Sequence, residues 1–246
     1  MAKVFLLCGQ SNMVGAGVAE ELPGAFRVVP DNVRFFEDGA FRELLWRDNF
    51  GPELGFARSV GPALGDEQVV LCKVARSGAN LYYDWNPDGV SSGPEDDYRG
   101  PLYPELQTAY EELSSKLGDG GEQLGVAGVL WMQGERDSVF EGMAEAYRAN
   151  LRAFIASVRR DFGDGREIPF LIGEIAPRVY DLDKEEFRHP FRHKVQSGQR
   201  EAARTGPRTA PVETTGLPQS DNLHFDTAGQ ILLGRRFAEA YLCLVE

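Results

Sequence analysis

The 246-residue sequence is poor in cysteine and histidine, with three residues of each. Cys8, Cys72 and Cys243 lie far apart in apolar surroundings, which indicates buried thiols and argues against a disulfide framework or a zinc site. No stretch approaches the roughly 18 consecutive apolar residues that a membrane-spanning helix needs. These shortages make disulfide-stabilised secreted modules and membrane proteins poor descriptions of the chain.

Positive charge is also scarce, since 26 Lys and Arg residues face 38 Asp and Glu residues, for a formal net charge of -12. An acidic surface repels phosphate backbones and anionic lipid headgroups, so we expect neither nucleic acid nor membrane partners. The apolar run Val4–Cys8 is too short for the core of a secretory signal, so the chain as written is expected to be cytoplasmic. A signal removed from the parent gene would leave no trace, and the oligomeric state stays open.

Short apolar runs alternate with longer amphipathic segments, which predicts a parallel sheet covered by helices, an α/β fold. With no repeat or linker in sight, we expect one domain over residues 1–246. The predicted strands are Val4–Cys8, Val69–Ala75, Val126–Met132, Pro169–Ile175 and Ala210–Thr214, and the predicted helices are Glu53–Leu64, Pro104–Leu117, Met143–Asp161, Phe191–Arg204 and Thr227–Leu244.

Two segments, Ala16–Phe50 and Tyr82–Arg99, are too long and irregular to be simple connections. Each follows a predicted strand, and ligands of open parallel sheets bind beyond the carboxyl ends of the strands. Both segments are therefore expected to border a functional cleft.

A serine follows the first predicted strand in Gly9-Gln10-Ser11-Asn12-Met13. On a tight turn its hydroxyl can point into the cleft, and the backbone N–H groups there can hold an oxyanion. Capping of the next segment explains such a serine equally well.

A second polar segment, Ser220–Asp226, precedes the last predicted helix and contains Asp221 and His224. A serine hydroxyl becomes a good nucleophile only when a base takes its proton, and a third group must orient that base. Asp221 is well spaced to orient His224, although a turn-capping aspartate and a surface histidine are the plainer interpretation. Asp226 is better interpreted as the N-cap of the final helix.

The third predicted strand runs into Trp131-Met132-Gln133-Gly134-Glu135-Arg136-Asp137. The Gln133 amide could donate to a developing oxyanion, and Glu135 could orient a neighbour or the substrate. Alternatively, this segment is a turn before a helix, with Glu135 and Asp137 favouring its N-terminus.

Taken in order, these three motifs resemble the sialate O-acetylesterase / acetyl xylan esterase family of the SGNH (GDSL-like) hydrolases. The segments 51–57 and 73–81, with Trp85 after them, resemble two further parts of that family, so the likeness runs from about Val4 to about Phe237. It implies a three-layer α/β/α fold with a flavodoxin-like five-stranded parallel sheet.

The resemblance also implies roles for individual residues. Ser11 would be the nucleophile, His224 the base and Asp221 the third triad member, with an oxyanion hole from the N–H groups of Ser11 and Gly78 and the Gln133 side chain. Two departures are Ser77 where relatives often have glycine, and Arg136 where serine is more usual. Residues expected to bind substrate are Gln10, Asn12, Trp85, Glu135 and Arg136.

The expected activity is removal of acetyl groups from a small or oligomeric carbohydrate, of xylan or sialate type, without metal or organic cofactor. An inactive carbohydrate-binding protein on the same fold and a short-chain esterase without sugar preference stay open. Sialate would need a cationic pocket, which Arg76, Arg99 and Arg136 could supply. A metal site at His189 and His193 is disfavoured because Pro190 separates them and no third ligand is evident.

Overall fold

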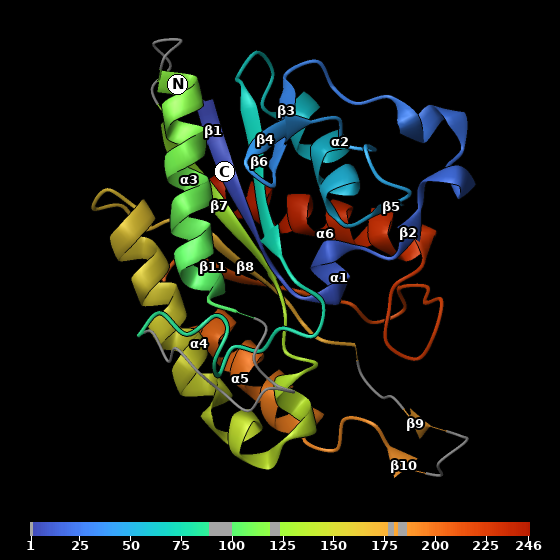
Figure 1. Ribbon diagram of the computed structural model, residues 1–246, viewed down its shortest axis with the longest axis vertical. Coiled ribbons are helices and arrows are strands. Elements are labelled where there is room, and N and C mark those ends of the chain that lie inside the picture. The colour runs from blue at the N-terminus through green and yellow to red at the C-terminus, as the bar shows by residue number, and fades with distance from the viewer. Residues whose placement is uncertain (1, 89–99, 119–123, 177–179, 182–185) are drawn as a thin grey trace.

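A computed structural model describes residues 2–88, 100–118, 124–176, 180–181 and 186–246 of the chain (Figure 1). Its centre is a seven-stranded sheet of order β11-β8-β7-β1-β6-β3-β4, in which all neighbours run parallel except the β3–β4 pair. The strands of this sheet are β1 (Ala2–Gly9), β3 (Val33–Glu37), β4 (Ala40–Arg42), β6 (Val69–Ala75), β7 (Leu124–Met132), β8 (Phe170–Gly173) and β11 (Thr209–Val212).

Helices cover both faces of the sheet, which gives three layers (Figure 1). Phe5 of β1 packs on one face against Phe56 and Tyr241, with ring centroids 4.9 and 4.8 Å away. Trp131 of β7 packs on the other face against Phe154 at 4.5 Å. The first face is covered by α2 (Glu53–Ala63) and α6 (Thr227–Val245), and the second by α3 (Leu102–Gly118), α4 (Glu141–Phe162) and α5 (Arg192–Thr205).

The remaining elements are short and lie mostly near the carboxyl ends of the sheet strands (Figure 1). They are the helix α1 (Ser11–Val14), the paired strands β2 (Gly17–Val18) and β5 (Asn49–Phe50), the paired strands β9 (Tyr180–Asp181) and β10 (Glu186–Phe187), and the 3₁₀ turns Ala19–Glu21, Gly24–Arg27 and Asp137–Val139.

The α/β fold and its three layers are confirmed, and the five predicted strands and five predicted helices are all present with shifts of one to two residues at most ends. The five-stranded sheet needs correction, because β3 and β4 extend it to seven strands. They arise within the segment 16–50, which the sequence analysis treated as irregular. Asp38 and Gly39 form their turn with φ of 50° and 68°. An Asp-Gly pair between two segments that contain aromatic residues is a sequence signal for such a hairpin.

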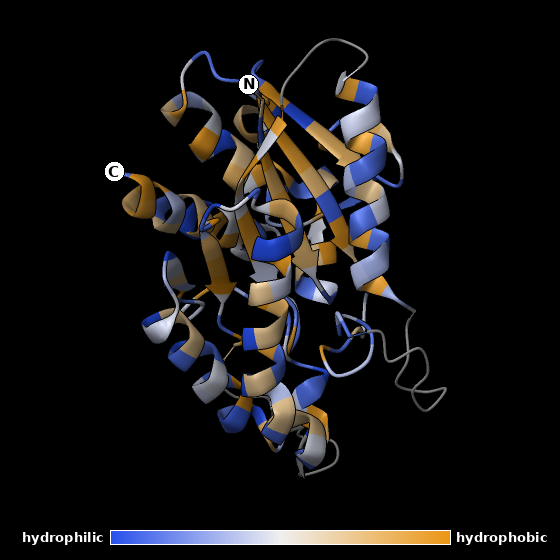
Figure 2. Cartoon of the chain, turned by 90° about the vertical axis from the view of Figure 1, so that its left-hand side faces the viewer, coloured by the Kyte–Doolittle hydropathy of each residue, from blue (hydrophilic) through white to orange (hydrophobic). Residues whose placement is uncertain are grey.

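Burial explains why the central strands were recognisable from sequence. The strands are almost entirely hydrophobic, whereas the helices alternate between hydrophobic and hydrophilic residues (Figure 2). A parallel strand covered on both faces has no solvent side and therefore needs a continuous apolar run. Among the described residues, no helix combines the length and hydrophobicity required to cross a bilayer.

A buried ion pair joins the sheet to the short helix α1. Lys73 of β6 donates from Nζ to Glu53 Oε2 and to the Val14 carbonyl, both at 2.9 Å. Glu53 in turn accepts from the Gly51 N–H at 2.7 Å. Both charged side chains are only 3% exposed. The pair thus fixes the C-terminal end of α1 against β6 and α2.

Replacing Lys73 with Met should lower the free energy of unfolding by about 3–5 kcal/mol, because the Glu53 carboxylate is left buried without its cation. Urea unfolding at pH 7 measures the change. The exposed Arg235–Glu239 pair, 65% and 55% exposed, provides the control: Arg235→Ala should cost less than about 1 kcal/mol. Equal costs for the two variants would contradict a structural role for the buried pair.

Candidate active site

Ser11 lies directly beyond the carboxyl end of β1. Gly9 closes that strand so tightly against β7 that a Cβ there would lie 2.1 Å from the Met132 carbonyl oxygen. Ser11 is the first residue of α1, where backbone N–H groups have no partner within the helix. No described residue accepts a hydrogen bond from the Ser11 N–H. This donor is therefore available beside the half-buried Ser11 side chain.

Asp221 and His224 lie together in the loop before α6. Asp221 Oδ2 is 2.8 Å from His224 Nδ1, while Oδ1 accepts from the backbone N–H groups of Leu223 and His224 at 2.6 Å each. Partial burial by itself would raise the pKa of Asp221, but the hydrogen bonds from His224 and Leu223 hold it below its ordinary value. The ionised carboxylate favours a proton on Nδ1, which leaves Nε2 of His224 as the basic nitrogen.

Asn12 joins these two parts of the site. Its Nδ2 donates to the Leu223 carbonyl at 3.1 Å, and its Oδ1 accepts from the Phe225 N–H at 3.1 Å. The residue after Ser11 thus binds the neighbours of His224 on both sides. The described contacts include no hydrogen bond between Ser11 and His224 themselves; the link between their segments is made by Asn12. The Asp226 side chain caps α6 by accepting from Gly229 N–H at 2.8 Å, as predicted.

The turn after β7 is held by Gln10. The Gln10 side-chain oxygen accepts from the N–H groups of Gly134 and Arg136 and from Gln133 Nε2, each at 3.2 Å. Gln10 is 3% exposed and Gln133 is fully buried. Gln133 Nε2 also donates to Ala79 O at 3.2 Å. Gln133 therefore lies between the turn after β1 and the turn after β6.

Asp137 ties the Gln133 amide to the turn that contains Gly78. Its Oδ2 accepts from Gln133 Nε2 at 2.6 Å and from the Leu81 N–H at 2.9 Å. Complete burial raises the pKa of Asp137 to about 7, despite hydrogen bonds that lower it. Gly78 has a φ of 74°, whereas Ser77 does not adopt a positive φ, so the departure at Ser77 leaves the turn undisturbed.

The residues expected to bind substrate are mostly inside the protein. Asn12, Glu135 and Gln10 are no more than 3% exposed, and Glu135 Oε1 accepts from Asn12 Nδ2 at 2.8 Å. The expectation for Trp85 is corrected, because it is fully buried against Trp131 and has no surface for a sugar ring. These buried side chains support the neighbouring turns and are not available to contact a substrate.

Two of the three candidate arginines lie among the described residues, and each has a contact of its own. Arg136 is half-buried, with its guanidinium 5.2 Å from the Phe140 ring centroid. Arg76 forms an ion pair with Glu105 at 2.6 Å. Arg99 lies outside the described residues.

His189 has a structural contact that sequence reasoning missed. Its Nδ1 is 2.8 Å from the Glu135 carbonyl and 3.1 Å from Ser138 Oγ, which braces the turn after β7. Burial lowers its pKa to about 4. Within the described ranges, no three His, Cys, Asp or Glu side chains gather as a metal site would require. The contact of Asp137 with Gln133 was not predicted either, because an acidic residue at this place in the sequence is explained equally well by a helix start.

A serine at the carboxyl end of β1, an Asp–His pair before the last helix and a mostly parallel α/β/α sandwich are the arrangement that the resemblance to the SGNH hydrolases implies. The family model described as "carbohydrate esterase, sialic acid-specific acetylesterase" matches residues 1–243. The chain therefore belongs to this carbohydrate esterase family.

Individual relatives agree with this assignment. A protein of Arabidopsis thaliana named as a probable carbohydrate esterase is 28% identical over 98% of this chain and 90% of its own length. The X-ray structure of the protein from that locus has a TM-score of 0.76, with 25% identity over 98% of both chains. Est24, a carbohydrate acetylesterase from Sinorhizobium meliloti, shares the fold with a TM-score of 0.61 at 13% identity, over 99% of this chain and all of that one.

Replacing Asn12 with Ala should loosen the His224 loop, because the Leu223 carbonyl and the Phe225 N–H lose their partner. We expect faster hydrogen exchange over residues 221–226. The free energy of unfolding should fall by about 1–3 kcal/mol for each buried group left unpaired. Asn32 offers a control with the same number of side-chain hydrogen bonds, since its Nδ2 donates to the carbonyls of Gly61, Gly65 and Glu67. Asn32→Ala should leave exchange over 221–226 unchanged, and equal effects of both variants there would contradict the role of Asn12.

Asp137 should make stability fall with rising pH. Its pKa in the folded state, about 7, exceeds the ordinary value of 3.8, so the folded chain binds the proton more tightly than the unfolded chain does. The free energy of unfolding therefore decreases between about pH 4 and pH 7, by up to about 4 kcal/mol for this group. Asp137→Asn should remove this decrease, so its stability relative to the wild type rises across that window. Urea unfolding from pH 4 to pH 8 tests this, and parallel pH curves would refute it.

Proposed function

We propose that the protein removes acetyl groups from carbohydrate by acyl transfer through Ser11. The observation that carries the proposal is the contact between Asp221 and His224. The loop that holds this pair is bonded to Asn12, the residue that follows Ser11 in sequence. A serine, a histidine and an oriented carboxylate are the parts that nucleophilic ester cleavage requires.

In the proposed reaction, His224 Nε2 takes the proton of the Ser11 hydroxyl as Oγ attacks the acetyl carbonyl. The carbonyl electrons move onto its oxygen to give a tetrahedral oxyanion. Collapse of this intermediate breaks the bond to the sugar oxygen, which His224 protonates as it leaves. Water then attacks the acetyl-enzyme with the same help from His224, releasing acetate and restoring Ser11. Asp221 stabilises the imidazolium at each stage.

The oxyanion would be held by the N–H groups of Ser11 and Gly78 and by the Gln133 amide. Gln133 Nε2 has two hydrogens but three acceptors, Asp137 at 2.6 Å and Gln10 and Ala79 at 3.2 Å. The oxyanion would replace one of the two longer contacts. Asp137, with the shortest contact, would keep the amide oriented throughout.

Two alternatives make different demands on the site. An inactive carbohydrate-binding protein would have no need of the Asp221–His224 pair, yet both residues are present and in contact. An esterase without sugar preference would cleave an aryl acetate and an acetylated sugar with similar efficiency. A panel of substrates therefore separates these functions.

The decisive measurement is acetate release from p-nitrophenyl acetate, acetylated xylo-oligosaccharides and O-acetyl sialic acid. Ser11→Ala should lower kcat/KM at least about 10³-fold on every ester that the wild type cleaves. Ser114→Ala, on α3, serves as the matched control and should retain activity. If the wild type released no more acetate than Ser11→Ala from any ester, the proposed function would be wrong.

A further inference from the structure

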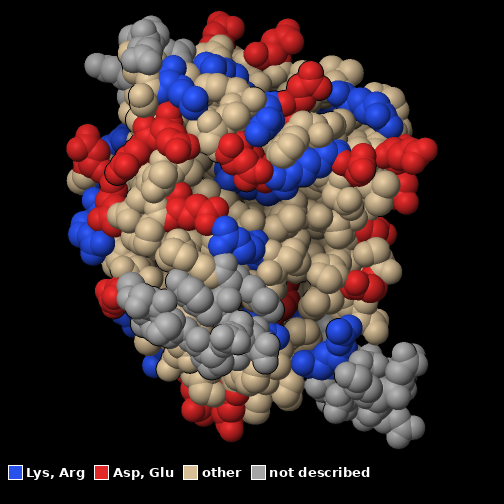
Figure 3. Space-filling model, viewed as in Figure 1, with Lys and Arg blue, Asp and Glu red and all other residues tan. Residues whose placement is uncertain are grey.

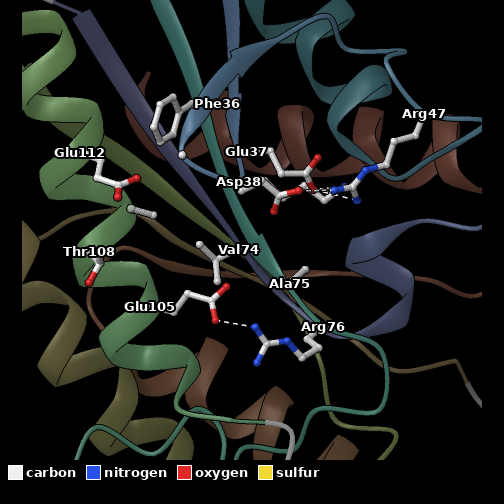
Figure 4. A pocket seen from close by; sticks show the side chains of 13 residues that line it. Phe36, Glu37, Asp38, Arg47, Val74, Ala75, Arg76, Glu105, Thr108 and Glu112 are labelled. Carbon is white, nitrogen blue, oxygen red and sulfur yellow. Dashed lines mark hydrogen bonds and ion pairs between the residues drawn. The ribbon is translucent and has the colours of Figure 1, made fainter.

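A cavity of about 310 Å³ opens between α3, the end of β6 and the β3–β4 hairpin (Figure 4). Its volume lies at the lower end of the range for small-ligand pockets. It forms because β3 pairs with β6 only as far as the Glu37–Lys73 position and then turns away at Asp38 and Gly39. The β6 edge beyond Lys73 is thus left open to the cavity on that side.

The cavity wall is continuous with the segment that contains Ser11. Ala75 lies opposite Gly9 in the β1–β6 pairing, and the Arg76 N–H donates to Gly9 O at 3.3 Å. Lys73, also in the wall, donates to the Val14 carbonyl at the far end of α1. Neighbouring strands are about 4.8 Å apart. The cavity wall is therefore bonded through its backbone to the end of β1, two residues before Ser11.

The lining of the cavity carries charges of both signs, with one more carboxylate than cations. Four carboxylates, Glu37, Asp38, Glu105 and Glu112, face three cations. Each cation has an acidic partner: Arg76 pairs with Glu105 at 2.6 Å, Arg47 with Asp38 at 2.6 Å and Lys73 with Glu53 at 2.9 Å. Acidic and basic side chains alternate over this face of the molecule (Figure 3).

We infer that this cavity is a subsite for a neutral, hydroxyl-rich sugar unit of the acetylated substrate, and that it disfavours sugars that carry a carboxylate. Carboxylate oxygens accept hydrogen bonds from sugar hydroxyls, and the guanidinium groups donate to them. A carboxylated sugar would find no unbalanced positive charge here and would meet a slight excess of negative charge. This inference rests on the proposed function and identifies the alcohol half of the ester.

Filling the cavity tests the subsite. Thr108 lies on the exposed side of α3 and lines the cavity, whereas Glu111, one turn further along α3 and also exposed, does not. Thr108→Trp should lower kcat/KM for an acetylated xylo-oligosaccharide about tenfold or more, with less than about a twofold change for p-nitrophenyl acetate, which has no sugar. Glu111→Trp should leave both unchanged.

Reversing a charge tests the discrimination. Glu112→Lys makes the lining net positive and should raise kcat/KM for O-acetyl sialic acid relative to the neutral oligosaccharide about fivefold or more. Activity of either variant on p-nitrophenyl acetate confirms an intact catalytic centre. Equal loss on all esters with Thr108→Trp, no loss at all, or an unchanged substrate ratio with Glu112→Lys would overturn the inference. Wild-type activity no greater than that of Ser11→Ala would instead refute the proposed function itself.

Discussion

The hydrogen bonds of a single buried amide hold the candidate site together. Asn12 binds the Glu135 side chain, the Leu223 carbonyl and the Phe225 N–H, which come from parts of the chain more than 80 residues apart in sequence. The amide is fully buried, so each of these groups would be unpaired without it. The positions of the Ser11 turn, the turn after β7 and the His224 loop therefore depend on one another.

A second layer of polar contacts connects the same turns. Gln10 fixes the turn after β7, and Asp137 connects that turn to the one after β6 through Gln133 and Leu81. Buried polar networks are costly when incomplete and stabilise one unique arrangement when their groups are paired. Most of the polar residues in the motifs are thus buried and hold neighbouring turns in place.

The sequence was informative wherever one local rule governed the structure. Continuous apolar runs predicted the five buried strands, and the Asp226 cap followed from its place before α6. The chemistry of the motifs suggested Ser11, Asp221 and His224, and the structure brings the last two into contact. The sequence could not reveal that Asn12 and Glu135 are buried and bind each other, because contacts across 123 residues depend on the packed fold. Trp85 was misjudged for the same reason, since an aromatic ring in a polar segment looks identical whether it lies in the core or on a rim.

The β3–β4 hairpin has a consequence for how such an enzyme can diversify. It joins the sheet at its edge, through β6 alone, and takes no part in the Asn12, Gln10 or Asp137 contacts. Two more residues in each arm of the hairpin would extend the pairing along β6 and close the cavity, while leaving the Ser11 turn untouched. If the cavity binds the sugar as inferred, insertions and deletions at Asp38–Gly39 would change which sugar is accepted while leaving the contacts of Asn12, Gln10 and Asp137 in place.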